Sequence, residues 1–190
     1  PADLNLLTPQ VRQFERVELE LATSITASNP FDPNTATVDA TVTLPSGRKI
    51  RVPGFWFQDF TRSISNPGAS GGERVEALTP TGKPGWRIRF ASPEAGRHTV
   101  EAEWRIDGQS GKTKPLTVEI GPGERPGYIG ASPRNPLYLE HSTGKPFFAI
   151  GENLCMYEKR EGTYYYDRML PKLSSNGANY VRLWQEYYVP

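Results

Sequence analysis

Five side chains near the end of the chain are of types that can bind or process a substrate. They are Glu152, Asn153, Arg182, Trp184 and Tyr187. The first two follow the apolar run 146–151. Arg182 lies within the run 180–184, Trp184 ends it, and Tyr187 follows it. A carboxylate and an amide can hydrogen-bond to polar groups, a guanidinium can hold a carboxylate, and a flat aromatic face can stack on a sugar ring.

The elements that must position these side chains read as strand, helix and strand. An apolar helical stripe lies between the two runs, with spacing i, i+3, i+4 and i+7: Tyr166, Met169, Leu170 and Leu173. Asn176-Gly177 supplies a helix stop, and Pro171 predicts a kink or a restart within the helix. The pattern predicts a right-handed parallel βαβ unit, in which chemistry collects at the carboxyl ends of the strands. Because two strands make no parallel sheet, we expect a larger domain to begin here.

Composition excludes several classes of protein. The net charge is +1 over 190 residues, with basic and acidic residues interleaved, which indicates no nucleic-acid partner. No apolar run approaches the ~20 residues of a membrane span. The one cysteine, Cys155, allows no internal disulfide and is expected to be a small buried residue, and His98 and His141 are too far apart to suggest a metal site. We expect neither a metal nor a cofactor.

The first 120 residues alternate between apolar and polar side chains. This period of two, broken by turn residues, predicts an immunoglobulin-like antiparallel β-sandwich of about seven strands. The side chains expected inside are Val17, Leu19, Val42, Trp86, Ile88, Val100 and Trp104. Residues Thr61–Gly85 interrupt the strands and are interpreted as a long loop. The predicted domains are the sandwich at 1–121, a Gly- and Pro-rich linker at 122–136, and an α/β portion at 137–190.

Several short motifs carry a resemblance to a known family. In the sandwich these are Asn29-Pro30-Phe31, Leu44-Pro45-Ser46-Gly47, Val52-Pro53-Gly54-Phe55 and Trp86-Arg87-Ile88-Arg89-Phe90, with Pro93 and Gly96. They resemble the immunoglobulin-like domain of unknown function that precedes the catalytic barrel of many bacterial glycoside hydrolases. Tyr138-Leu139 and Gly144-Lys145-Pro146-Phe147-Phe148 resemble the lead-in hairpin and first strand of that barrel, and Gly177-Ala178-Asn179-Tyr180-Val181-Arg182 resembles the G-x-N-x-V-R segment on the second strand of clan A, family-five-like hydrolases.

The resemblance implies an amino-terminal portion of a secreted, periplasmic or cell-surface bacterial glycoside hydrolase acting on oligo- or polysaccharide. The fold would then be a sandwich followed by the first strand, helix and strand of a (β/α)8 barrel, whose remainder would be the partner of this portion. The catalytic glutamates of the family lie on later strands, so their positions are expected beyond Pro190 and this portion is not catalytically complete. The alternative is a non-catalytic carbohydrate-binding or cell-surface adhesion module.

Each candidate residue also has a structural interpretation. By the resemblance, Arg182 approaches the nucleophilic carboxylate, but it could instead form an ion pair between strands. Glu152 could contact a sugar hydroxyl or neighbouring strand ends, with catalysis the least favoured role. Trp184 and Tyr187 could stack on sugar rings or pack beneath a loop. Similarly, Trp56 could be a sugar platform, although a consecutive aromatic triplet favours packing in the core or against the barrel.

Overall fold

The computed structural model describes residues 2–64, 76–154 and 162–184. Two compact units divide the chain. The first comprises Pro1–Asp59, Gly82–Tyr128 and His141–Thr143, and the second comprises Phe60–Thr81, Ile129–Glu140 and Gly144–Pro190. Tyr187 and Cys155 lie outside the described residues, so the interpretations placed on them stay predictions.

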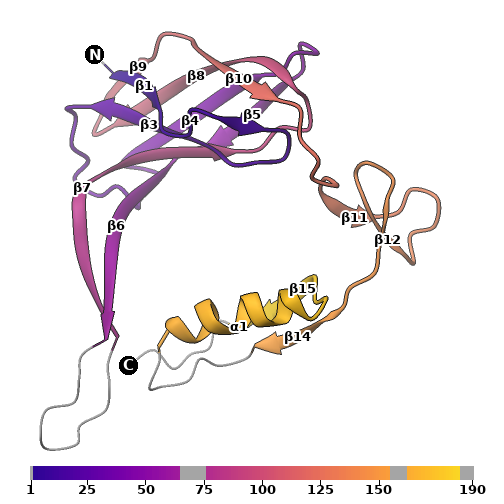
Figure 1. The fold of residues 1–190 in the computed structure, drawn as a ribbon. Helices are drawn as coiled ribbons and strands as arrows, with labels where there is room; N and C mark the ends of the chain where they lie inside the picture. Colours follow the sequence, from indigo (N-terminus) through magenta and orange to yellow (C-terminus); the bar gives the residue numbers. More distant parts are fainter. Residues whose placement is uncertain (1, 65–75, 155–161, 185–190) are drawn as a thin grey trace, which may run out of the picture. The chain divides into compact units, whose positions relative to one another are not determined.

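Two β-sheets form the first unit (Figure 1). One sheet has the order β1 (Ala2–Leu6), β3 (Val17–Thr23), β7 (Glu76–Phe90) and β6 (Phe55–Ile64). The other has the order β2 (Val11–Arg12), β10 (Leu116–Gly121), β8 (Gly96–Ile106), β4 (Ala36–Thr43) and β5 (Lys49–Pro53), with β9 (Gln109–Lys112) paired to β8. The pairing is antiparallel except between β10 and β2. The prediction of a β-rich first part is therefore confirmed.

The core between the sheets contains most of the side chains predicted for it. Five of them are 0% exposed: Val17, Leu19, Val42, Ile88 and Val100. Trp86 is also buried, and Trp56 packs against the same core with its ring 5.6 Å from that of Trp86. Trp104 is only half-buried, although it lies between Val38 of β4 and Gly111 of β9 and packs against the core.

A buried polar pair closes one end of the sandwich. His98 and Ser92 are both fully buried, with His98 Nε2 2.7 Å from Ser92 Oγ and Nδ1 3.0 Å from the Gly96 carbonyl oxygen. The Ser92 hydroxyl also accepts a hydrogen bond from the Glu94 amide. Both ring nitrogens and the hydroxyl are therefore satisfied within the protein, as a buried polar group requires.

The interruption predicted at Thr61–Gly85 is largely a β-hairpin. Strand β6 continues to Ile64 and β7 starts at Glu76, so the prediction of a long loop is wrong for the described part of this segment. The side chains of β7 from Ala77 to Lys83 are all exposed. Because this part of the strand has no buried face, its sequence shows no apolar alternation that could reveal it.

The second unit contains two small sheets and a helix. Strands β11 (Ile129–Ala131), β12 (Leu139–His141) and β13 (Pro146–Phe147) form one sheet, in which β12 and β13 are antiparallel and Leu139 lies opposite Phe147. Strands β14 (Gly151–Leu154) and β15 (Tyr180–Leu183) pair in parallel on either side of α1 (Tyr164–Ser175) in the sequence. The chain therefore contains a βαβ unit, and no other strand among the described residues joins this parallel pair.

The first strand of this unit differs from the prediction. The run 146–151 is not one buried strand: it divides between β13 and β14, and Phe148 and Ile150 between them are 80% and 54% exposed. Phe147 is half-buried, so only part of the apolar run is exposed in the described structure.

Helix α1 ends where the sequence predicts but does not restart at Pro171. It runs unbroken from Tyr164 to Ser175. Gly177 has φ +86°, its amide bonds to the Ser174 carbonyl, and the Ala178 amide bonds to the Leu173 carbonyl, which closes the helix with the left-handed turn that glycine permits.

Candidate functional site

The parallel pair brings two of the five predicted site residues, Asn153 and Arg182, onto one face. Asn153 lies directly opposite Arg182 in the register, and Glu152 lies opposite Val181. Because neighbouring residues of a strand point to opposite faces, Asn153 and Arg182 share one face and Glu152 belongs to the other. Glu152 and Asn153 therefore lie within β14 rather than after a strand, since the strand begins at Gly151.

Arg182 and Trp184 interact on that face. The guanidinium carbon of Arg182 is 5.5 Å from the centre of the Trp184 ring, within the range of a cation–π contact. Both side chains are exposed. The arrangement presents a fixed positive charge beside an aromatic surface, a combination that can orient a carboxylate and stack on a sugar ring.

Asn179 links β14 to β15, a role that the sequence analysis did not predict. Its side-chain oxygen accepts a hydrogen bond from the Ile150 amide at 2.9 Å, and its Nδ2 donates to the Phe148 carbonyl at 3.0 Å. Its own amide donates to the Ile150 carbonyl at 2.8 Å. One side chain thus sets where β14 and β15 come together, which explains why an amide rather than an apolar residue stands at this position.

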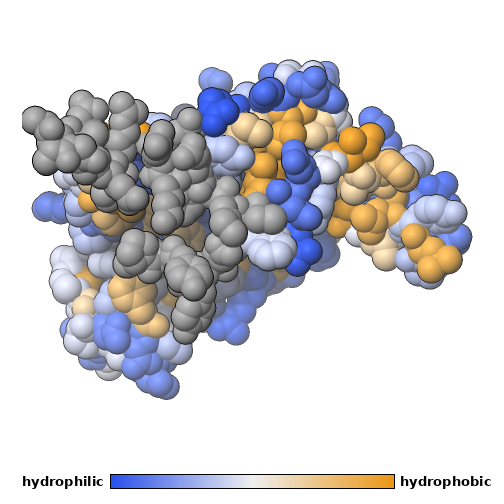
Figure 2. Space-filling model, turned by 90° about the horizontal axis from the view of Figure 1, so that it is seen from below, coloured by the Kyte–Doolittle hydropathy of each residue, from blue (hydrophilic) through white to orange (hydrophobic). Residues whose placement is uncertain are grey.

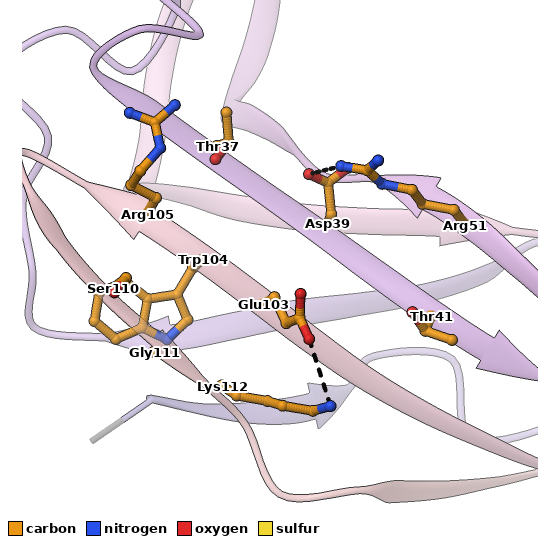
Figure 3. Close-up of a pocket in the computed structure, with 10 residues that line it drawn as sticks. All are labelled: Thr37, Asp39, Thr41, Arg51, Glu103, Trp104, Arg105, Ser110, Gly111 and Lys112. Carbon is orange, nitrogen blue, oxygen red and sulfur yellow. Dashed lines mark hydrogen bonds and ion pairs between the residues drawn. The ribbon is translucent and has the colours of Figure 1, made fainter.

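A second candidate site lies in the first unit. A hollow of about 650 Å³ lies over strands β4, β5, β8 and β9, and we call it the polar hollow. Figure 3 shows the residues that line it. Its lining is Thr37, Asp39, Thr41, Arg51, Glu103, Trp104, Arg105, Ser110, Gly111 and Lys112. The sequence predicted a place in the core for Trp104 and no role for the other lining residues, because they belong to the polar, solvated side of the pattern.

Charge pairs order the side chains of the polar hollow. Arg51 Nη2 donates to Asp39 Oδ2 at 2.7 Å, and Lys112 Nζ lies 3.5 Å from Glu103 Oε1 (Figure 3). Hydrogen bonding to Asp39 raises the pKa of Arg51 above its usual value. Arg105 donates to two backbone carbonyls at 2.8 Å each. The lining therefore offers donors and acceptors of both charges with little net charge, which suits a neutral polyhydroxylated ligand.

Trp104 lies against Gly111 at the edge of this hollow. A Cβ atom at position 111 would lie 2.6 Å from the indole ring, so glycine is needed for the ring to occupy this place. The indole Nε1 is buried and has no hydrogen-bond partner among the described residues. An indole N–H normally finds a partner when it is buried, so this atom is an unused donor.

The described residues contain no group of three His, Cys, Asp or Glu side chains that could hold a metal ion. Within the same part of the chain, no helix is long and apolar enough to cross a membrane.

The described structure is that of a β-rich domain with a small α/β unit, and comparison with known families places the first part. The sequence profile of the domain of unknown function DUF5060 matches residues 10–105, just over half of the chain. The chain therefore belongs to this family. No curated protein and no solved structure matches it significantly.

Proposed function

We propose that the chain is the amino-terminal portion of a glycoside hydrolase, with an immunoglobulin-like accessory sandwich followed by the first βαβ unit of a (β/α)8 barrel. The observation that carries the proposal is the parallel β14–β15 pair in which Asn153 and Arg182 are directly opposite. Active-site residues of such barrels lie at the carboxyl ends of the strands. The resemblance of 177–182 to the second strand of clan A hydrolases supports the same assignment.

The distribution of exposed apolar side chains also supports a larger α/β domain. Of the 15 large hydrophobic residues exposed in the described structure, 12 belong to the second unit, although the first unit supplies all but one of the 21 buried hydrophobic residues. Figure 2 shows apolar side chains exposed in several places on one face of the molecule. Exposure on this scale marks surfaces that another part of a protein covers, which here would be the remaining strands and helices of the barrel.

In this proposal Arg182 is a positioning residue. Its guanidinium would hold the nucleophilic carboxylate of a later strand in the ionised form by paired hydrogen bonds, while the second carboxyl group of the barrel donates the proton. Trp184 would stack on the sugar ring, and Asn153 would hydrogen-bond to a hydroxyl. The enzyme would act on polysaccharide outside the cytoplasm, at the cell surface or in the periplasm, or after secretion.

A hydrolysis assay tests the proposal. Residues 1–190 alone should release no reducing sugar from any polysaccharide, whereas the chain extended by its natural continuation should do so. In the extended enzyme Arg182→Lys should lower kcat by about 100-fold and shift the acidic limb of the pH profile upward, because a lysine cannot replace the paired hydrogen bonds.

The matched control is Arg97→Lys, at an exposed ion pair of the sandwich, which should leave kcat unchanged. Hydrolysis by residues 1–190 that Glu152→Gln abolishes would contradict the proposal, as would an extended enzyme that Arg182→Lys leaves unaffected.

The polar hollow favours a second candidate function, that of a carbohydrate-binding module. A neutral glycan could hydrogen-bond to the Asp39 and Glu103 oxygens and to the Arg51 donors. In affinity electrophoresis with soluble polysaccharides, Arg51→Ala should weaken binding by about tenfold, as the loss of a hydrogen bond to a charged group predicts. Arg97→Ala on the same sheet removes an equally exposed arginine and should have no effect. Equal loss in both variants, or no binding by the unaltered chain, would refute this function.

A further inference from the structure

The outer part of the β6–β7 hairpin makes a dense set of contacts with the start of α1. We call residues 60–64 and 76–81 the outer hairpin; they belong to the same compact unit as the helix. Arg62 Nη2 donates to Asp167 Oδ2 at 2.6 Å, and Nη1 donates to Thr163 Oγ1 at 2.9 Å. The Arg62 guanidinium also lies 4.5 Å from the centre of the Tyr164 ring, and the Tyr164 hydroxyl donates to the Arg62 carbonyl at 2.8 Å.

The other strand of the outer hairpin caps the helix. Thr163, at the N-cap, makes no capping bond with its own side chain. Instead its amide donates to Glu76 Oε2 at 2.8 Å and its hydroxyl donates to Glu76 Oε1. A carboxylate at this position satisfies a free amide and interacts favourably with the positive end of the helix dipole.

A glycine directly before the N-cap allows the Glu76 carboxylate to come close to the start of α1. Gly162 has φ +57°, and a Cβ atom there would lie 2.7 Å from Glu76 Oε2. Asp167 stands in the first turn of α1, one turn after Thr163, so both side chains can reach Arg62 from one side of the helix.

We propose that the outer hairpin is a docking surface for the amino end of α1, with Arg62 and Glu76 as its anchors. The helix has no buried residue of its own, and a twelve-residue helix is marginal alone in water, so these contacts set whether its first turn forms. The role of the outer hairpin is then to hold the amino end of α1 within their shared unit. The proposal rests on contacts within one unit and is independent of the hydrolase activity.

Carbodiimide cross-linking tests the contact directly. In an Arg62→Lys variant of the chain, a zero-length carbodiimide should join position 62 to Asp167, and peptide mass spectrometry would identify the linked pair. An Arg97→Lys variant is the positive control, because Arg97 Nε lies 3.1 Å from Glu119 Oε1 within the sandwich. A link at 97–119 without one at 62–167 would overturn the proposal.

Hydrogen exchange tests the consequence for the helix. Glu76→Gln keeps the shape of the side chain and removes its charge, so amides 163–167 should exchange roughly fivefold faster, in the range of a lost helix cap. Glu119→Gln, at an exposed carboxylate of the sandwich, should leave them unchanged. Equal exchange in Glu76→Gln and the unaltered chain would show that the hairpin does not stabilise the helix.

Discussion

Replacing Glu18 by Gln should lower the free energy of unfolding by about 2 kcal/mol, a large loss for a conservative change. Glu18 is 8% exposed on the outer side of β3, where it lies opposite Arg89 in the neighbouring strand. Arg89 Nη2 donates to its Oε1 at 2.9 Å, and Arg16 Nε and Arg87 Nε lie 3.4 Å and 3.9 Å from its carboxylate. Without that charge, three guanidinium groups remain close together with one fewer partner.

Two phenylalanines make this loss larger than it would be at an open surface. The Arg89 guanidinium lies 4.9 Å from the centre of the Phe55 ring and 5.0 Å from that of Phe57. The rings limit the access of water to the charges, so solvent screens them less than it screens an exposed pair. Glu119→Gln breaks an ion pair whose two side chains are 64% and 76% exposed and should cost less than 0.5 kcal/mol. Urea denaturation of both variants measures the difference, and equal costs would contradict the argument.

The effect of Glu18 should also depend on pH. The hydrogen bond from Arg89 is the largest of the causes that hold the pKa of Glu18 below its usual value. A carboxyl group whose pKa is lowered by folding stabilises the protein above its unfolded-state pKa, near 4.3, and this contribution disappears as the pH falls through the folded-state pKa. The stability difference between the unaltered chain and Glu18→Gln should therefore be constant from pH 6 to 7 and shrink below about pH 4.

The sequence predicted the part of the fold that has one buried and one solvated face. Strands β3, β4, β8 and the second half of β7 alternate with period two, and their apolar residues fill the core. Strands β2 and β9 were not predicted, because two and four residues are too short to show a period. The strands of the outer hairpin were not predicted for a different reason. They are long, but their side chains are mostly exposed on both faces, so no apolar alternation marks them.

The sequence predicted which residues belong to the candidate site, but it did not predict how β14 and β15 align them. The apolar run 146–151 suggested a strand that ends before Glu152, whereas β14 begins at Gly151 and contains both Glu152 and Asn153. Placing them within the strand separates the two side chains onto opposite faces, and only Asn153 joins Arg182. The contacts of Asn179 with residues 148–150 fix this register, and no local pattern in the sequence reveals them.

Gly151 is the position at which this register can be tested with the largest effect. A Cβ atom there would overlap the carbonyl oxygen of Tyr180, its partner in the parallel pair. Because that oxygen is part of the backbone, the overlap can be relieved only by moving the two strands apart. Gly151→Ala should therefore break the β14–β15 pair and make the amides of 152–154 and 181–183 exchange about 30-fold faster, which corresponds to roughly 2 kcal/mol.

Gly130→Ala provides the matched control, since a Cβ atom at position 130 meets nothing within 4 Å. In that variant the amides of β14 and β15 should exchange at the same rates as in the unaltered chain. The free energy of unfolding of the sandwich should be the same in both variants, because its core contains no residue of β14 or β15. Unchanged exchange at 152–154 in Gly151→Ala would mean that Gly151 and Tyr180 are not adjacent. The register of the parallel pair would then be wrong. Asn153 would not lie beside Arg182, and the proposed hydrolase site depends on that placement.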